Sequence, residues 1–316
     1  MGIRSGRSRR HRSLYRCRRL FRHPFRLSVL AHGRMNIPAC RRQRSYSAMA
    51  LESIGIVGCG AIGRALIKAV EEGTLPARIG GVTSRTEKSA RDFLSTFENP
   101  PPYRSIMDLI ADSDLVVEAA GASVVPVLAE GVFAAGKALM VLSVGALLDH
   151  PEIMEQSRRA GRRLYIPSGA IAGLDGIKSA CVGKIDHVTI TTRKPPRGLE
   201  AAPYLVQNGI SLAGLVKEKE VFSGTAREAC RGFPSNVNVS AAVSLAGIGP
   251  DQTLIRIRAV PGLERNCHDI EVDGEFGRLH VHIENIPGEN PKTGKLTAFS
   301  IIRSLRDITD PVCIGT

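Results

Sequence analysis

The sequence lacks the features that would place it in a membrane or hold it together by disulfide bonds. No stretch of about 18 apolar residues is free of charge, so no membrane partner is expected. The seven cysteines are scattered and form no C-x-x-C pair. We therefore expect reduced thiols in a reducing compartment, the cytoplasm, and neither a disulfide framework nor a metal site.

Acidic residues are absent from the first 50 positions. That segment contains fourteen Arg and no Lys, Asp or Glu. Because the whole chain has 43 Lys and Arg and 30 Asp and Glu, the remainder carries 29 basic residues against 30 acidic ones. The folded part is nearly neutral, so the net charge of +13 does not predict a nucleic-acid partner for it. The 316 residues are enough for two globular domains.

Residues 1–50 are expected to have no stable structure of their own, because they are rich in Arg and Ser and show no hydrophobic period. Three interpretations remain open. The segment resembles a mitochondrial presequence that ends near Arg44–Ser47, which would make the protein mitochondrial. Alternatively, translation starts at Met35 or Met49 and the upstream residues are untranslated sequence. The third interpretation is a nucleic-acid-binding arm.

The folded part begins with an apolar run that leads into the spacing G-x-G-x-x-G and then into a helical pattern. Gly58 allows a sharp turn, Gly60 lets a phosphate approach the backbone, and Gly63 lets the helix lie close to the strand. The amides at the start of that helix, at Ala61 and Ile62, would face the phosphates. The pattern predicts a pyrophosphate site for NAD or NADP, and an ordinary Gly-rich turn is the alternative.

The end of the second expected strand, residues 78–82, bears on the choice between NAD and NADP. An acidic residue at this position would bind the ribose and repel a 2′-phosphate. The sequence instead has Thr83, Ser84 and Arg85. A hydroxyl beside a guanidinium suits a phosphate, so we expect Ser84 and Arg85 to accept NADP, unless Arg85 only faces solvent.

Buried strands are expected at 114–118, 139–144 and 163–167, the last as a sixth strand. They alternate with helices at 87–97 and 105–111 and one that begins at 122. Such alternation predicts a parallel sheet with helices on both faces. Ligands bind beyond the carboxyl ends of such strands, which places Ala120 among the cofactor contacts.

The pattern changes after the Gly- and Ala-rich turn at 168–175, which is expected to face the nicotinamide. Strands are expected at 186–193, 218–224, 253–260, 268–272 and 277–283, and helices at 225–230, where Thr225 is the N-cap, and 298–308. The fold class is therefore α/β: a Rossmann-type doubly wound parallel sheet at 51–170, followed at 171–316 by an α+β domain with a mostly antiparallel sheet. The second domain would carry the substrate site and pair subunits.

Several polar motifs follow one another in a distinctive order. They are Gly58–Gly63, Pro167–Asp175, Lys194–Pro196, Phe233–Val239, Asn266–His268 and Glu284–Thr293. Over about residues 52–316 the chain resembles the L-aspartate dehydrogenase family. The resemblance implies a homo-oligomer, a dimer or tetramer. It also implies that NAD or NADP is used to interconvert L-aspartate and iminoaspartate, which yields oxaloacetate and ammonia or is used for quinolinate and NAD synthesis.

The resemblance also implies roles for individual residues. His268 matches the catalytic histidine, and histidine exchanges protons near neutral pH. Asn238 and Ala170 match cofactor contacts, and a pure helix cap is the alternative for Asn238. We further predict that Lys292 and Thr293 bind a substrate carboxylate, since a dicarboxylate needs cationic partners.

Two other functions remain open at this stage. One is a related enzyme with the same cofactor domain, such as homoserine or aspartate-semialdehyde dehydrogenase. The absence of a nucleophilic cysteine in a Gly- and Ser-rich loop weighs against the semialdehyde enzyme. The other is a non-catalytic NAD(P)-binding sensor, against which the joint presence of His268 and Asn238 argues.

Overall fold

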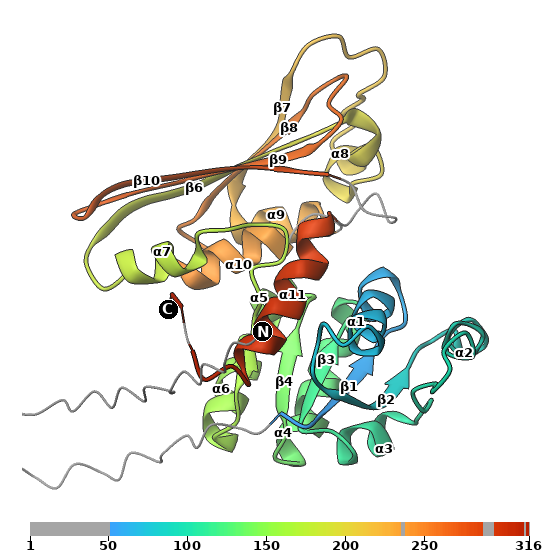
Figure 1. The fold of residues 1–316 in the computed structure, drawn as a ribbon. Coiled ribbons are helices and arrows are strands. Elements are labelled where there is room, and N and C mark those ends of the chain that lie inside the picture. The colour runs from blue at the N-terminus through green and yellow to red at the C-terminus, as the bar shows by residue number, and fades with distance from the viewer. Residues whose placement is uncertain (1–50, 235–237, 287–293, 313, 316) are drawn as a thin grey trace, which may run out of the picture. The chain divides into compact units, whose positions relative to one another are not determined.

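The computed structural model describes residues 51–234, 238–286, 294–312 and 314–315 (Figure 1). The predictions for the N-terminal segment and for Lys292 and Thr293 lie outside these residues. Among the described helices, none has the length and hydrophobicity needed to cross a membrane.

The first sheet is parallel throughout and has the strand order β2-β1-β3-β4-β5. The segment expected as a sixth strand is the fifth, and only two of its residues pair in the sheet. The strands are β1 (Ser53–Val57), β2 (Arg78–Thr83), β3 (Leu115–Glu118), β4 (Ala138–Val141) and β5 (Leu164–Tyr165). The helices between and after them are α1 (Ala61–Glu71), α2 (Glu87–Leu94), α3 (Ile106–Ala111), η1 (Ala122–Val124), α4 (Val125–Ala134), α5 (Ala146–Asp149) and α6 (Glu152–Ala160).

Both faces of this sheet are covered, as the alternation of neighbouring residues on β3 shows. Val116 packs in the apolar cluster that contains Leu128 of α4. Its neighbour Val117 packs on the other face with Leu66 of α1 and Ile301 of the C-terminal helix α11 (Lys295–Asp307). Successive strand residues point to opposite faces, so two covered faces explain why β3 and β4 are apolar almost throughout. The predicted doubly wound parallel sheet is confirmed.

The second sheet has the strand order β10-β9-β6-β8-β7, in which only the β6–β8 pair is parallel. This confirms a mostly antiparallel sheet. The strands are β6 (Ile185–Lys194), β7 (Lys219–Thr225), β8 (Leu254–Ala259), β9 (Asn266–Gly274) and β10 (Gly277–Asn285). The remaining helices are α7 (Leu174–Ala180), η2 (Pro196–Gly198), α8 (Pro203–Gln207), α9 (Ala226–Gly232) and α10 (Asn238–Ala246).

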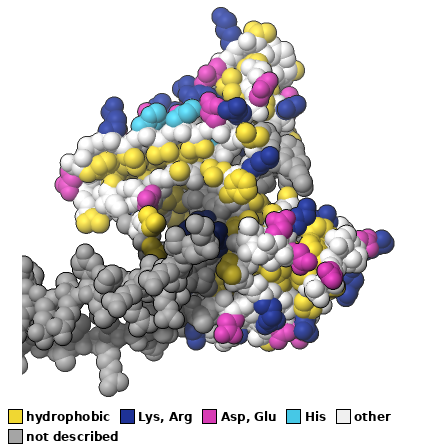
Figure 2. All heavy atoms as spheres, viewed as in Figure 1, with side chains coloured by type: hydrophobic (Ala, Val, Ile, Leu, Met, Phe, Trp, Pro, Cys, Tyr) yellow, Lys and Arg dark blue, Asp and Glu magenta, His cyan; other side chains and the backbone are white. Residues whose placement is uncertain are grey.

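Helices α7, α9 and α10 cover one face of this sheet (Figure 1). The opposite face carries charged and His side chains, which Figure 2 shows along the upper surface of the molecule. His280 and His282 of β10 belong to this outer face, with side chains 51% and 48% exposed. The period of two along each strand thus separates them from His268, which is buried on the covered face.

Two local features bear on the predicted boundaries. Thr225 caps α9 as expected: its hydroxyl accepts from the Glu228 amide at 3.2 Å, and the Glu228 carboxylate accepts from the Thr225 amide at 2.8 Å. Helix α11, which the sequence assigned to the second domain, buries Ile301 and Leu305 against the first sheet. The division at residues 170 and 171 stays a prediction.

Candidate functional site

The glycine loop after β1 has the backbone geometry that a pyrophosphate requires. Gly58 has φ +112°, and a Cβ there would overlap the carbonyl of Ala119. A Cβ at Gly63 would overlap the carbonyl of Gly58, so this glycine lets α1 lie against the loop. At Gly60, by contrast, no atom beyond its chain neighbours lies within 4 Å of the Cβ position. Gly60 therefore faces open space, where a ligand fits.

The first turn of α1 faces the same space. The Gly60 carbonyl accepts from the Arg64 amide at 2.9 Å. The preceding amides, at Ala61, Ile62 and Gly63, come before the first intrahelical bond and are available to an anion. The residues present therefore fit the phosphates of a dinucleotide.

The two residues expected to discriminate between NAD and NADP follow β2. The Ser84 carbonyl accepts from the Tyr103 hydroxyl at 2.8 Å, which positions its backbone. Arg85 is exposed. Exposure suits a residue that waits for a phosphate and equally one that only faces solvent, so the roles of Ser84 and Arg85 stay predictions.

A buried carboxylate that the sequence analysis did not single out organises the next two loops. Glu118 at the end of β3 is 0% exposed. Its carboxylate accepts from the amides of Ala120 and Gly121 at 2.8 Å and from the amide and hydroxyl of Ser143 at 2.9 and 3.0 Å. Backbone amides and a hydroxyl, rather than a cation, satisfy this acid, so it ties the loops after β3 and β4 together beside the glycine loop.

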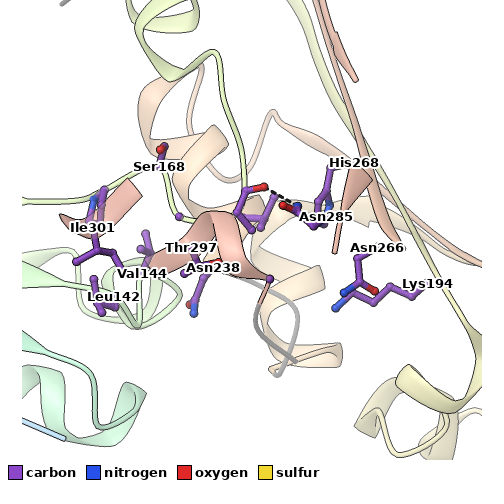
Figure 3. A pocket seen from close by; sticks show the side chains of 15 residues that line it. Leu142, Val144, Ser168, Lys194, Asn238, Asn266, His268, Asn285, Thr297 and Ile301 are labelled. Atoms are coloured by element: carbon purple, nitrogen blue, oxygen red, sulfur yellow. Dashed lines mark hydrogen bonds between the residues drawn. The ribbon is translucent and has the colours of Figure 1, made fainter. Parts of the chain in front are cut away.

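A cavity lies where the carboxyl end of the first sheet meets the covered face of the second (Figure 3). Its walls come from the loop after β4, the turn at 167–170, the start of α10, the ends of β6, β9 and β10, and α11. The labelled lining residues in Figure 3 are Leu142, Val144, Ser168, Lys194, Asn238, Asn266, His268, Asn285, Thr297 and Ile301.

His268 contributes the titratable ring of this cavity. It stands opposite Thr192 in the β6–β9 pair, and Nδ1 lies 3.0 Å from the Thr192 hydroxyl. The pKa of His268 falls from 6.5 to about 3, chiefly because burial disfavours the charged ring and also because Lys194 lies nearby, while Asp269 acts in the opposite direction. The imidazole is therefore neutral near pH 7, and the neutral ring is the form that accepts a proton.

Two amide side chains join the two halves of the cavity. Asn285 of β10 is 4% exposed and donates to the Ala170 carbonyl at 2.7 Å. Asn238, at the start of α10, accepts from the Gly145 amide at 3.2 Å. This contact reaches across to the first sheet, so Asn238 does more than a helix cap would.

The structure brings Ala170, Asn238 and His268 to one cavity, although about a hundred residues of sequence separate the first from the last. The lining of this cavity does not include Gly58, Gly60, Gly63 or Ala120, which follow the carboxyl ends of β1 and β3. The other end of a dinucleotide would bind there. The sequence analysis missed Thr192, Lys194 and Asn285 as site residues. Lys194 and Asn285 stand in motifs that carried the resemblance, which was the available signal. Across the described ranges no cluster of His, Cys, Asp and Glu is suited to a metal ion.

A parallel sheet with a glycine-lined phosphate loop, joined to a second sheet that supplies a buried histidine, defines an NAD(P)-dependent dehydrogenase. Family models match both halves: "Aspartate dehydrogenase, C-terminal" over residues 175–308 and "Homoserine dehydrogenase, NAD binding domain" over residues 58–167. The L-aspartate dehydrogenases of Methanosarcina mazei and Methanocella arvoryzae are 46% and 44% identical to the chain, over 83% of it and 99% of each relative. The chain belongs to the L-aspartate dehydrogenase family.

Solved structures support the same fold. Aspartate dehydrogenase from Thermotoga maritima superposes with a TM-score of 0.63 at 23% identity, over 84% of this chain and 99% of that one. A homoserine dehydrogenase from Thiobacillus denitrificans superposes with a TM-score of 0.56 at 12% identity, over 82% and 73%. At these identities the likeness concerns the fold alone.

Proposed function

We propose that the protein is an NAD(P)-dependent L-aspartate dehydrogenase that interconverts L-aspartate and iminoaspartate. The observation that carries the proposal is the buried, neutral His268 in a cavity shared with Ala170 and Asn238. The names of the similar proteins support the choice of substrate. The imine would hydrolyse to oxaloacetate and ammonia or be used for quinolinate and NAD synthesis.

The residues of the candidate site would have separate roles in this reaction. The loop Gly58–Gly63 would hold the pyrophosphate, and Ala170 and Asn238 the nicotinamide end. The cofactor, when bound, accepts or returns a hydride at its nicotinamide ring. His268 would accept a proton from the substrate ammonium group through Nε2, since Thr192 engages Nδ1. Loss of that proton leaves the nitrogen lone pair from which the C=N bond forms. In the reverse direction the imidazolium returns the proton.

The substrate assignment is tested with oxaloacetate, ammonia and NADH or NADPH, followed by the loss of nicotinamide absorbance. Homoserine with NAD or NADP is the comparison substrate, because the cofactor half matches the homoserine dehydrogenase domain. Oxidation that requires both oxaloacetate and ammonia supports the proposal. Activity with homoserine alone would identify the protein as the related homoserine dehydrogenase. NADPH binding without any dehydrogenase activity would indicate a non-catalytic sensor.

The remaining assignments are proposals of the same kind. Ser84 and Arg85 would accept the NADP 2′-phosphate, and Lys292 and Thr293 would contact a substrate carboxylate. A homodimer or homotetramer is tested by light scattering on the purified protein.

Location is the last of these assignments. We propose the cytoplasm, which suits the free thiols of Cys59, Cys181, Cys230 and Cys267. Mass spectrometry of the native N-terminus tests this location, because a start near residues 45–48 would indicate a cleaved mitochondrial presequence instead.

A further inference from the structure

Lys194 ends β6 on the face of the sheet that lines the cavity. Thr192 lies two residues earlier and therefore on the same face, opposite His268 on β9. Lys194 pairs with Ala259 of β8, is 9% exposed and lines the cavity. The register of three strands thus places Lys194 and His268 on the same wall of the cavity.

The charge of this wall of the cavity comes from Lys194. Among the described lining residues, it is the one with a basic ammonium side chain. The nearest acid in sequence to His268 is Asp269, which lies on the outer face, where it accepts from His282 at 2.6 Å and pairs with Arg193. The field of Lys194 reaches the imidazole, because it contributes to the lowered pKa of His268. An anion that enters here meets a cation.

The position of Lys194 decides which part of an anionic substrate it meets. In Figure 3, Lys194 and Asn266 lie on one side of the cavity, and Leu142 and Val144, which follow β4 of the first sheet, lie on the other. The nicotinamide would enter from the first sheet, where the dinucleotide loop lies. The reacting carbon must face the nicotinamide, so a group bound to Lys194 is the part of the substrate farthest from it.

We propose that Lys194 binds the side-chain carboxylate of the substrate and so selects a dicarboxylic amino acid over a monocarboxylic one. The inference rests on the proposed function, in which the reacting carbon is Cα of aspartate. Hydride transfer at Cα then leaves the side-chain carboxylate as the distal group. The α-carboxylate stays beside the reacting carbon, within reach of other residues.

The test compares oxaloacetate with pyruvate, which lacks the distal carboxylate, in the ammonia-dependent reaction of wild type and Lys194→Met. We expect kcat/KM for oxaloacetate to fall roughly 10²-fold, while turnover of pyruvate is not lower than in wild type. The inhibition constant of succinate, a dicarboxylate without a reacting group, should rise by a similar factor. Lys194→Arg, which keeps a basic side chain, should restore part of kcat/KM for oxaloacetate and part of the affinity for succinate. KM for NADPH should stay constant.

Lys217→Met is the matched control, because Lys217 is exposed and lies outside the cavity. Lys194→Gln serves the same comparison if the methionine variant does not fold. A parallel fall for oxaloacetate and pyruvate, or no change for oxaloacetate, would overturn the proposal. A wild-type protein without dehydrogenase activity that binds succinate through Lys194 would reject the proposed reaction and keep the carboxylate site. Calorimetric titration with succinate distinguishes these two failures.

Discussion

The Thr192 hydroxyl lies 3.0 Å from Nδ1 of His268, directly across the β6–β9 pair, and both side chains are buried. The contact joins two residues 76 positions apart in sequence. It holds the imidazole in one orientation on the covered face of the sheet and leaves Nε2 for the substrate. Several consequences of this arrangement can be measured.

Replacement of His268 by Ala removes the proposed base from the cavity. We expect turnover to fall by roughly 10²–10⁴-fold with NADPH binding intact. His282→Ala is the control, because His282 is on the outer face of the same sheet. Unchanged turnover in His268→Ala, with cofactor binding retained, would reject the assignment of His268.

Thr192→Val keeps the shape of the side chain and removes the contact with Nδ1. We expect kcat to fall about 10–100-fold, less than on loss of the ring itself, because the ring stays but loses its fixed orientation. KM for NADPH should not change. The control is Thr189→Val on the outer side of the same strand. A loss as large as that of His268→Ala would mean that the hydroxyl does more than orient the ring.

The lowered pKa of His268 links protonation to stability. The folded protein binds a proton to this ring only near pH 3, whereas the unfolded chain binds it near 6.5. Protons therefore favour the unfolded state between these values, and stability contributed by the neutral ring is lost as the pH falls below 6.5. Urea unfolding should show a free energy that declines by up to about 1.4 kcal/mol per pH unit.

The matching variant for this measurement is His268→Gln, which has no titrating ring. The unfolding free energy of the wild type minus that of the variant should decrease as the pH is lowered from 7 to 4. A difference that is constant between pH 7 and pH 4 would show that the ring titrates normally in the folded protein.

Arg85→Ala tests the proposed 2′-phosphate contact. We expect the dissociation constant of NADPH to rise about tenfold, the loss of one charge-assisted contact, while that of NADH stays unchanged. Lys88→Ala removes a neighbouring exposed charge and is the control. If the ratio of the two dissociation constants does not move, Arg85 only faces solvent.

The three glycines of the phosphate loop should respond differently to alanine. Gly60→Ala should leave the melting temperature unchanged, because the position faces open space. It should weaken the binding of NADH and of NADPH by the same factor. Gly58→Ala and Gly63→Ala should lower the melting temperature, since their Cβ atoms overlap backbone carbonyls. Normal cofactor affinity in Gly60→Ala would show that no phosphate approaches the backbone there.

Elements with a strong local signal were predicted well. The spacing of Gly58, Gly60 and Gly63 predicted the turn between β1 and α1. The β-branched run predicted β6, the second sheet's longest described strand, which the structure extends to Ile185–Lys194. The short strand β5 was miscounted, since two paired residues leave hardly any pattern. The place of α11 against the first sheet was not anticipated, because an amphipathic pattern does not identify the surface that a helix covers.

The sequence by itself determined the class of each half, because periods of 2 and 3.6 residues and the glycine spacing are local properties. Motif resemblance predicted His268 and Asn238 as site residues, and both line the cavity. Only the tertiary structure decided that Thr192 contacts His268 and that Lys194 lines the same cavity. It also decided that Glu118 joins two loops and that His280 and His282 lie on the other face. These relations depend on strand register and on which face is covered, and both are set by packing between segments far apart in the chain.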